Sequence, residues 1–139
     1  MIISIDGNSI GKKLEKYILS EKLDELADFS KSISDYLILL KGIIERHAGK
    51  VFMCGGDNIL ASIDDEKLDV IINEIIKIKP PSDSTFSIGC GYSASLAFLA
   101  LAQRKSCLET HVSVTFCKIE NNKIVFQEKN MDQSASLFT

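Results

Sequence analysis

Two aspartates in this sequence each follow a short apolar run and lie beside glycine. Asp6 ends the apolar run at residues 2–5, and Asp57 follows the run at 52–54 and the pair Gly55-Gly56. Carboxylates next to glycine-rich turns suit hard cations, because Mg²⁺ takes a few carboxylates and completes its octahedron with water and substrate phosphates. A two-metal site of this kind activates an attacking hydroxyl and stabilises a leaving pyrophosphate. The pair of aspartates therefore indicates metal-dependent phosphoryl chemistry.

A phosphate-bearing substrate also needs hydrogen-bond donors and positive charge. Backbone N–H groups at the start of the helix near Ser9 can supply the donors, and Lys105 is a candidate point charge for a triphosphate. Each residue also has a purely structural explanation. Asp6 can cap a helix, residues 55–58 can be only a turn, and Lys105 can be a solvated lysine at a helix end. The joint placement of Asp6 and Asp57 favours the functional interpretation.

The order of the predicted elements brings the two aspartates together. Residues 1–6 form an apolar strand, and residues 50–54 and 59–63 form two more strands around the turn at 55–58. Helices separate the first strand from the second, which gives a split βαβ unit with the third strand between its two parallel members. Since the first two strands of a right-handed unit run parallel, both aspartates are predicted to emerge at the same edge of the sheet.

The other elements complete an α+β, ferredoxin-like fold. We expect a βαββ core, a central antiparallel sheet with helices on one face, and an extra C-terminal hairpin. Asn8 or Ser9 is expected to cap the helix that follows a turn at residues 7–9. The remaining predicted elements are a long helical region at 21–48, a helix after the acidic run 64–66, a strand at 85–92, a helix at 94–109, and a hairpin of strands 112–119 and 123–127. Residues 1–128 form one domain, and residues 129–139 form a tail.

Composition is that of an ordinary globular domain. The 139 residues are 45% apolar and 25% charged, with a net charge of −3, so nothing predicts nucleic-acid binding. The cysteines are isolated in apolar contexts, which predicts small buried hydrophobes in a reducing compartment; they are Cys54, Cys90, Cys107 and Cys117. No signal-peptide pattern and no membrane-spanning run is evident, so we expect a cytoplasmic protein that does not bind membranes directly.

Three blocks of this sequence resemble palm-type cyclases and polymerases. The blocks are Gly55-Gly56-Asp57, the strand end Ile5-Asp6-Gly7-Asn8-Ser9-Ile10-Gly11, and Ser87-Ile88-Gly89-Cys90-Gly91-Tyr92 followed by the helix at 97–105. The group includes GGDEF diguanylate cyclases and the palm domains of the large subunit of type III CRISPR complexes. A stand-alone palm with Asp-Gly-x-x-Ile-Gly after its first strand most closely resembles the minimal CRISPR polymerase (mCpol) family, over residues 1 to about 127.

This resemblance implies an activity and its partners. It implies a nucleotide cyclase that joins two ATP molecules into a cyclic dinucleotide, a cyclic di-adenylate signal in antiviral defence. A membrane-spanning effector would sense that signal. Such cyclases work as face-to-face homodimers, in which each subunit holds one nucleotide and each ribose hydroxyl attacks the α-phosphate of the other nucleotide.

The resemblance also implies roles for particular residues. Asp6 and Asp57 would bind Mg²⁺, or Mn²⁺, through their side chains and carry catalysis, and Gly7 would bind the cation through its carbonyl. The nucleotide-binding residues would be Asn8, Ser9, Ile10, Gly11, Gly55, Gly56, Asn58 and Lys105.

The sequence departs from the family pattern at acidic positions, and this keeps other functions open. Asn58 stands where an acid is usual, and Asn8 and Ser9 stand where many relatives carry aspartates. Fewer acids hold metal less well, whereas asparagine still donates and accepts hydrogen bonds. One alternative is therefore a catalytically degenerate palm that binds nucleotide or cyclic dinucleotide as a sensor. Others are a module that binds protein through its sheet, and a cyclase with another base or ring size.

Overall fold

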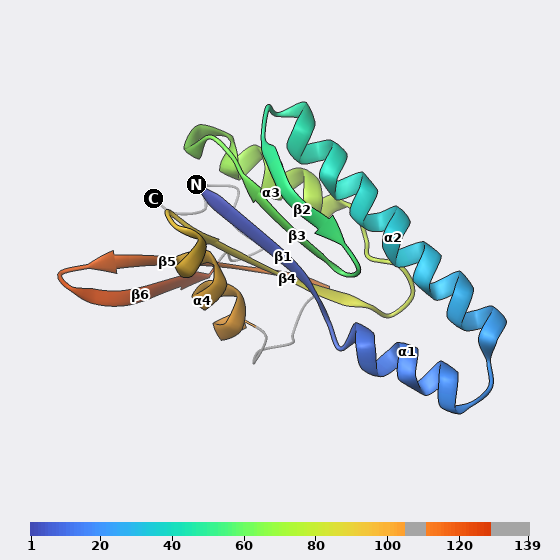
Figure 1. The fold of residues 1–139 in the computed structure, drawn as a ribbon. Helices are drawn as coiled ribbons and strands as arrows, with labels where there is room; N and C mark the ends of the chain where they lie inside the picture. Colours follow the sequence, from blue (N-terminus) through green and yellow to red (C-terminus); the bar gives the residue numbers. More distant parts are fainter. Residues whose placement is uncertain (105–110, 129–139) are drawn as a thin grey trace.

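The computed structural model describes residues 1–104 and 111–128. A six-stranded sheet with the order β2-β3-β1-β4-β5-β6 lies at its centre (Figure 1). In chain order the elements are β1 (Ile2–Asn8), α1 (Ile10–Leu19), α2 (Leu23–Arg46), β2 (Lys50–Gly55), β3 (Asn58–Ser62), the short 3₁₀ helix η1 (Asp65–Lys67), α3 (Leu68–Lys77), β4 (Thr85–Gly91), α4 (Ala94–Arg104), β5 (Val112–Glu120) and β6 (Lys123–Glu128). The predicted helix at 94–109 is present to Arg104, and its expected continuation lies outside the described residues, as does the tail.

The sheet topology confirms the split βαβ unit and the α+β fold class. β3 lies between β1 and β2 and pairs antiparallel with both strands, so β1 and β2 run in the same direction. β1 also pairs antiparallel with β4. The sheet as a whole is mixed, because β4 and β5 pair parallel before the antiparallel β5–β6 hairpin.

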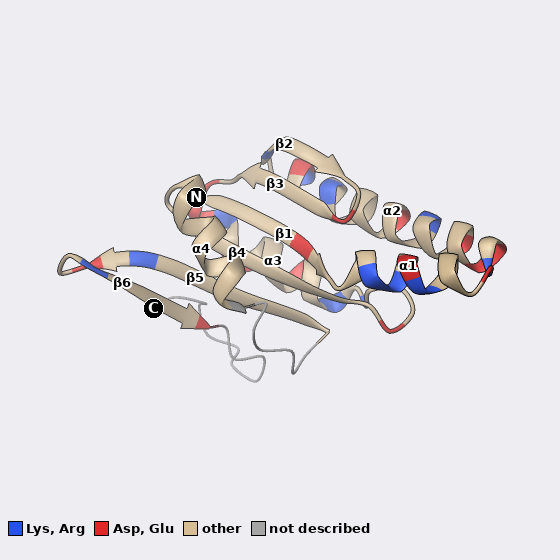
Figure 2. Cartoon of the chain, turned by 60° about the horizontal axis from the view of Figure 1, so that its bottom comes forward, with Lys and Arg blue, Asp and Glu red and all other residues tan. Residues whose placement is uncertain are grey.

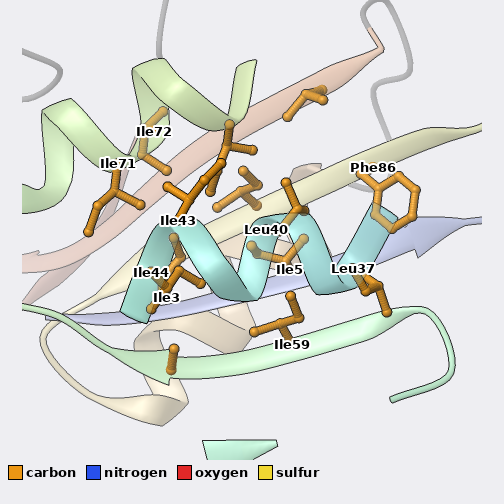
Figure 3. Close-up of a cluster of buried hydrophobic side chains, with 14 of the residues drawn as sticks. Ile3, Ile5, Leu37, Leu40, Ile43, Ile44, Ile59, Ile71, Ile72 and Phe86 are labelled. Atoms are coloured by element: carbon orange, nitrogen blue, oxygen red, sulfur yellow. The ribbon is translucent and has the colours of Figure 1, made fainter. Parts of the chain in front are cut away.

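The core lies between one face of the sheet and the helices α2 and α3. β1 contributes Ile3 and Ile5, both fully buried, and β3 contributes Ile59. These side chains meet Leu40 and Ile44 of α2 (Figure 3). The apolar positions of α2 recur at helical spacing, and that pattern is what turns a single stripe of the helix toward the sheet.

The helices cover both faces of the sheet, so the expectation of helices on one face was wrong. α4 lies on the face opposite α2 and α3 (Figures 1 and 2). Two glycines of β4 allow its close approach: a Cβ built on Gly89 would lie 2.3 Å from the carbonyl oxygen of Ala97, and one on Gly91 would lie 2.6 Å from the Cβ of Leu96. The small size of these two residues is therefore what lets the backbone of α4 lie against β4.

β1 is longer than predicted, and the predicted cap of α1 is absent. The strand continues through Gly7 and Asn8, because β4 pairs with it up to Asn8 and Thr85. Ser9 is the N-cap residue of α1, but it has φ 57° and its side chain makes no capping hydrogen bond. The acidic run at 64–66 likewise leads into η1 rather than directly into an α-helix.

The described cysteines are small buried or half-buried groups, as predicted. Cys90 and Cys117 are buried, Cys54 is half-buried, and all three are free thiols. Burial raises the pKa of Cys90 to about 12, so its thiol stays protonated and inert. Cys107 lies outside the described residues. Among the residues that the structure describes, no helix is long and apolar enough to cross a membrane.

Candidate functional site

The two aspartates lie at the same edge of the sheet, as their topology predicts. The backbone N–H of Gly7 donates a hydrogen bond to the carbonyl oxygen of Asp57 at 2.9 Å. Asp6, one residue earlier, stands opposite Asn58 in the β1–β3 register. Residues separated by about fifty positions in the chain are thus held together at the end of the sheet, Asp6 on a strand and Asp57 in the tight turn between two strands.

The two carboxylates approach the end of β1 from different sides. Asp6 alternates with the buried Ile5 and Gly7, so its half-buried side chain leaves the strand on the opposite face. The side chain of Asp57 packs against the Cα of Gly7: a Cβ on Gly7 would lie 3.0 Å from Oδ2 of Asp57. Glycine at position 7 therefore makes room for the second carboxylate.

The turn between β2 and β3 is the most open part of the site. It consists of Gly56 and Asp57 alone, because β2 ends at Gly55 and β3 begins at Asn58. Gly56 has φ +60°, a conformation that favours glycine. A Cβ on either glycine would meet nothing within 4 Å, so this surface is free to receive a ligand.

The β1–α1 junction presents backbone donors beside the aspartates. α1 has no side-chain cap and no acidic residue in its first turn. The N–H groups of a first helical turn have no partner within the helix, and they favour anions. Ile10 is buried and anchors the junction, whereas Ser9 and Gly11 are exposed. The side chain of Asn8 is engaged elsewhere: its amide donates to Oγ1 of Thr85 at 3.1 Å and its oxygen accepts from Ser87 at 2.9 Å.

A cavity between α1, α2 and the β2–β3 turn adjoins Asp57. This cavity, called here the α1–α2 pocket, has a volume of about 190 Å³. Its lining residues are Ile10, Gly11, Leu14, Ser30, Ile33, Ser34, Gly56 and Asp57. Sequence reasoning missed Ser30 and Ser34, although their i, i+4 spacing beside the buried Ile33 is a signal of two hydroxyls on one helix face.

Asp6 and Asp57 are the candidate carboxylates at this end of the sheet, and the Gly7 carbonyl is the further cation ligand that the sequence resemblance implies. The described part of the chain has no group of three or more His, Cys, Asp or Glu side chains that could hold a metal. Mg²⁺ is commonly bound by one or two carboxylates together with substrate phosphates. Asp6 and Asp57 match that number of carboxylates, with Asp6 leaving β1 on the face opposite Gly7 and Asp57 packing against Gly7. They do not form a complete protein cage, and Asn58 supplies an amide rather than a third carboxylate at that edge.

Lys105, the predicted phosphate-binding lysine, lies outside the described residues. The other predicted residues are brought to one end of the sheet, on three segments: the end of β1, the start of α1 and the β2–β3 turn.

A model of the minimal CRISPR polymerase domain (mCpol) matches residues 2–115. The chain belongs to the mCpol family. The match spans β1 to β5 and includes both aspartates, the glycine turn and the start of α1. Comparison with curated proteins finds no match. This mCpol domain is accordingly a CRISPR-associated palm domain of the polymerase and cyclase type, and nucleotidyl transfer is the class of activity that its family indicates.

Proposed function

We propose that this mCpol domain is a Mg²⁺-dependent nucleotide cyclase that converts two ATP molecules into cyclic di-AMP, an antiviral defence signal. The observation that carries the proposal is the hydrogen bond from Gly7 to Asp57. It holds one carboxylate against the strand that bears the other, beside the start of α1, which has no side-chain cap. Carboxylates, backbone donors and an open glycine turn are together what a nucleoside triphosphate requires.

Each residue group has a distinct task in this proposal. Asp6 and Asp57 hold the cation, with the Gly7 carbonyl as a further ligand. Bound Mg²⁺ would supply charge neutralisation and activation of the attacking hydroxyl. The first turn of α1 orients the phosphates, and Gly55 and Gly56 let the nucleotide approach the backbone. In each of two transfers a ribose oxygen bonds to an α-phosphorus, the bond to the β-phosphate oxygen breaks, pyrophosphate leaves, and the hydroxyl proton passes to water.

The α1–α2 pocket supports adenine as the base. Its volume is small beside sites that take whole drug-sized ligands, and it suits a single ring system. Ile10, Leu14 and Ile33 provide apolar walls for a flat base. The hydroxyls of Ser30 and Ser34 can both donate and accept, as the N1 and amino group of adenine require.

A homodimer is part of the proposal, because one site holds one nucleotide and ring closure needs two. The exposed glycine turn at the sheet edge is suited to face a second copy. Phe52 and Met53 of β2, the strand that leads into this turn, are 54% and 51% exposed. Large apolar side chains exposed together favour a protein contact. The diffusible product would couple the enzyme to a membrane effector without direct membrane binding.

The test is incubation of the purified protein with Mg²⁺ and each ribonucleoside triphosphate, with products identified by mass spectrometry. We expect cyclic di-AMP from ATP. Asp57→Asn should lower its formation by at least about a hundredfold, because a metal contributes several kcal/mol to such a transition state. Asp64→Asn, an exposed carboxylate outside the site, is the matched control. Wild-type turnover by Asp57→Asn would refute the assignment of the metal ligand.

A second candidate is a degenerate palm that binds nucleotide or cyclic dinucleotide as a sensor. Asn58 favours it, because this amide stands opposite Asp6 where a third acid would strengthen metal binding. Calorimetric binding of ATP or cyclic di-AMP, without pyrophosphate release in either Mg²⁺ or Mn²⁺, would support the sensor and contradict the cyclase.

A further inference from the structure

A larger cavity, of about 510 Å³, opens along a different face of α1 from the α1–α2 pocket. Its walls come from the end of β1, from α1, from the connection to α2 and from the loop before β4. Figure 2 shows the basic residues of α1 beside this loop. Four lysines line the cavity, which we call the lysine pocket: Lys12, Lys13, Lys16 and Lys22.

These lysines are not paired with a carboxylate of the described residues. In the part of the chain that the structure describes, none of the four forms an ion pair, whereas Lys31 pairs with Asp35 and Lys118 pairs with Glu120. Asp83 is the single carboxylate among the residues that line the pocket. This concentration of positive charge occurs in a chain whose net charge is −3.

The arrangement works against the stability of α1. Lys12 and Lys16 are four residues apart on one helix face, where like charges repel. Lys12 and Lys13 lie in the first turn, at the positive end of the helix dipole. Lys13 has one compensating contact, since its Nζ lies 4.8 Å from the centre of the Phe29 ring. A bound anion would remove both penalties.

The position of the pocket identifies the anion. It begins at Asn8, Ser9 and Ile10, the junction proposed to hold the nucleotide phosphates, and Ile10 also lines the α1–α2 pocket. A nucleotide whose base occupies the α1–α2 pocket can therefore cross the start of α1 and extend its phosphates toward the lysines. Lysine binds phosphate as a point charge and needs no fixed geometry.

We propose that the lysine pocket binds the β- and γ-phosphates of ATP and then the pyrophosphate that they become. This inference rests on the proposed function and extends it from the aspartates to the leaving group. When the bond between the α-phosphorus and the bridging oxygen breaks, that oxygen and its negative charge stay with pyrophosphate. The lysines stabilise this charge.

The test is isothermal titration calorimetry of the full chain with inorganic tripolyphosphate, ATP and adenosine at fixed ionic strength. Lys12→Gln/Lys16→Gln is compared with Lys41→Gln/Lys123→Gln, which removes the same charge away from the pocket. We expect the pocket variant to bind tripolyphosphate and ATP about tenfold or more weakly and adenosine unchanged. Asp83→Asn should tighten tripolyphosphate binding, because it removes the opposing charge. The matched control should behave as wild type.

Two outcomes would overturn the inference. One is equal tripolyphosphate affinity in the pocket and control variants. The other is lysine-dependent tripolyphosphate binding that ATP does not displace, which would make the pocket a separate anion site. Failure of the proposed function looks different: the protein would form no cyclic dinucleotide, while ATP and tripolyphosphate would still compete for a lysine-dependent site. That pattern would retain the phosphate pocket and reject the cyclase.

Discussion

The backbone N–H of Gly7 and the carbonyl oxygen of Asp57 are joined by a 2.9 Å hydrogen bond at the end of the sheet that carries the candidate site. This bond joins two backbone groups, so it does not use the carboxylate of Asp57. The register of β1 against β3, which this bond continues, therefore fixes where Asp57 lies relative to Asp6. The arrangement of the candidate metal ligands therefore depends on the contact between β1 and the β2–β3 turn.

Gly7→Ala should impair activity through this contact. The new Cβ would lie 2.4 Å from Cγ1 of Ile10 and 3.0 Å from Oδ2 of Asp57, so one of these side chains must move. We expect product formation to fall about a hundredfold, as for a small misplacement of a reacting group, and stability to fall by about 1–3 kcal/mol. Mass-spectrometric product assays and urea unfolding measure the two effects. Undiminished turnover would contradict the proposed role of Gly7.

Asn58→Asp should strengthen cation binding and lower the stability of the protein without the cation. A carboxylate directly opposite Asp6 in an antiparallel pair lowers stability by roughly 0.2–1 kcal/mol through repulsion. A cation between them reverses this effect, so the melting temperature should rise more on adding Mg²⁺ than in the wild type. Asn121→Asp, in the distant β5–β6 turn, carries the same charge change as a control. Equal Mg²⁺-dependent shifts in both variants would contradict the placement of the cation.

Gly89→Ala should destabilise the fold. Its Cβ would lie 2.3 Å from the carbonyl oxygen of Ala97 and 2.5 Å from the backbone nitrogen of Leu101, so α4 itself must shift. We expect the free energy of unfolding in urea to fall by about 1–3 kcal/mol or more. Gly42→Ala is the contrasting variant, because Gly42 is exposed within α2 and a Cβ built there would meet nothing within 4 Å; its free energy of unfolding should rise by about 0.5–1 kcal/mol. Similar effects of the two substitutions would refute close α4 packing.

Tyr36→Phe should leave stability unchanged or raise it by about 1 kcal/mol. The hydroxyl of Tyr36 is buried without a hydrogen-bond partner in the described structure, and burial raises its pKa well above the usual range. Phenylalanine keeps the ring contact with Phe86, whose centroid is 4.9 Å away. Tyr36→Leu removes this contact and should be destabilising. A clear loss of stability in Tyr36→Phe, measured by urea unfolding, would show that the hydroxyl is satisfied.

Glu74 should make stability depend on pH in the acid range. His47 hydrogen-bonds Glu74 at 2.8 Å and Arg46 pairs with it, and these interactions hold the pKa of Glu74 below its usual value. A lowered folded pKa contributes stability above the unfolded value, about 4.3, and this is lost as pH falls through the folded pKa. The urea midpoint of the wild type should therefore exceed that of Glu74→Gln near pH 6.

The two midpoints should converge as the pH falls below about 4. Glu66→Gln removes an exposed carboxylate elsewhere and should change the pH dependence of the urea midpoint little. A constant difference between wild type and Glu74→Gln across this range would contradict the assigned charge coupling.

Local chemistry and the order of elements were enough to predict the frame of the site. The glycines at 55 and 56 indicated a turn before any partner was known, because the conformational freedom of glycine is local. The shared edge of Asp6 and Asp57 followed from chain connectivity and handedness, which leave few arrangements for a split βαβ unit. The apolar spacing along α2 likewise indicates the buried positions Leu40 and Ile44, since helical periodicity is a local property.

Only the tertiary structure decided the features that depend on partners distant in the chain. Asn8 belongs to β1 because Thr85, 77 residues later, pairs with it; without that strand, residues 7–9 look like a turn. The lysine pocket exists because the loop carrying Asp83 packs near α1, and these two segments are far apart in the chain. The sequence by itself determined which residues can do chemistry, whereas long-range packing decided which surfaces meet around them, because such contacts have no local pattern in the chain.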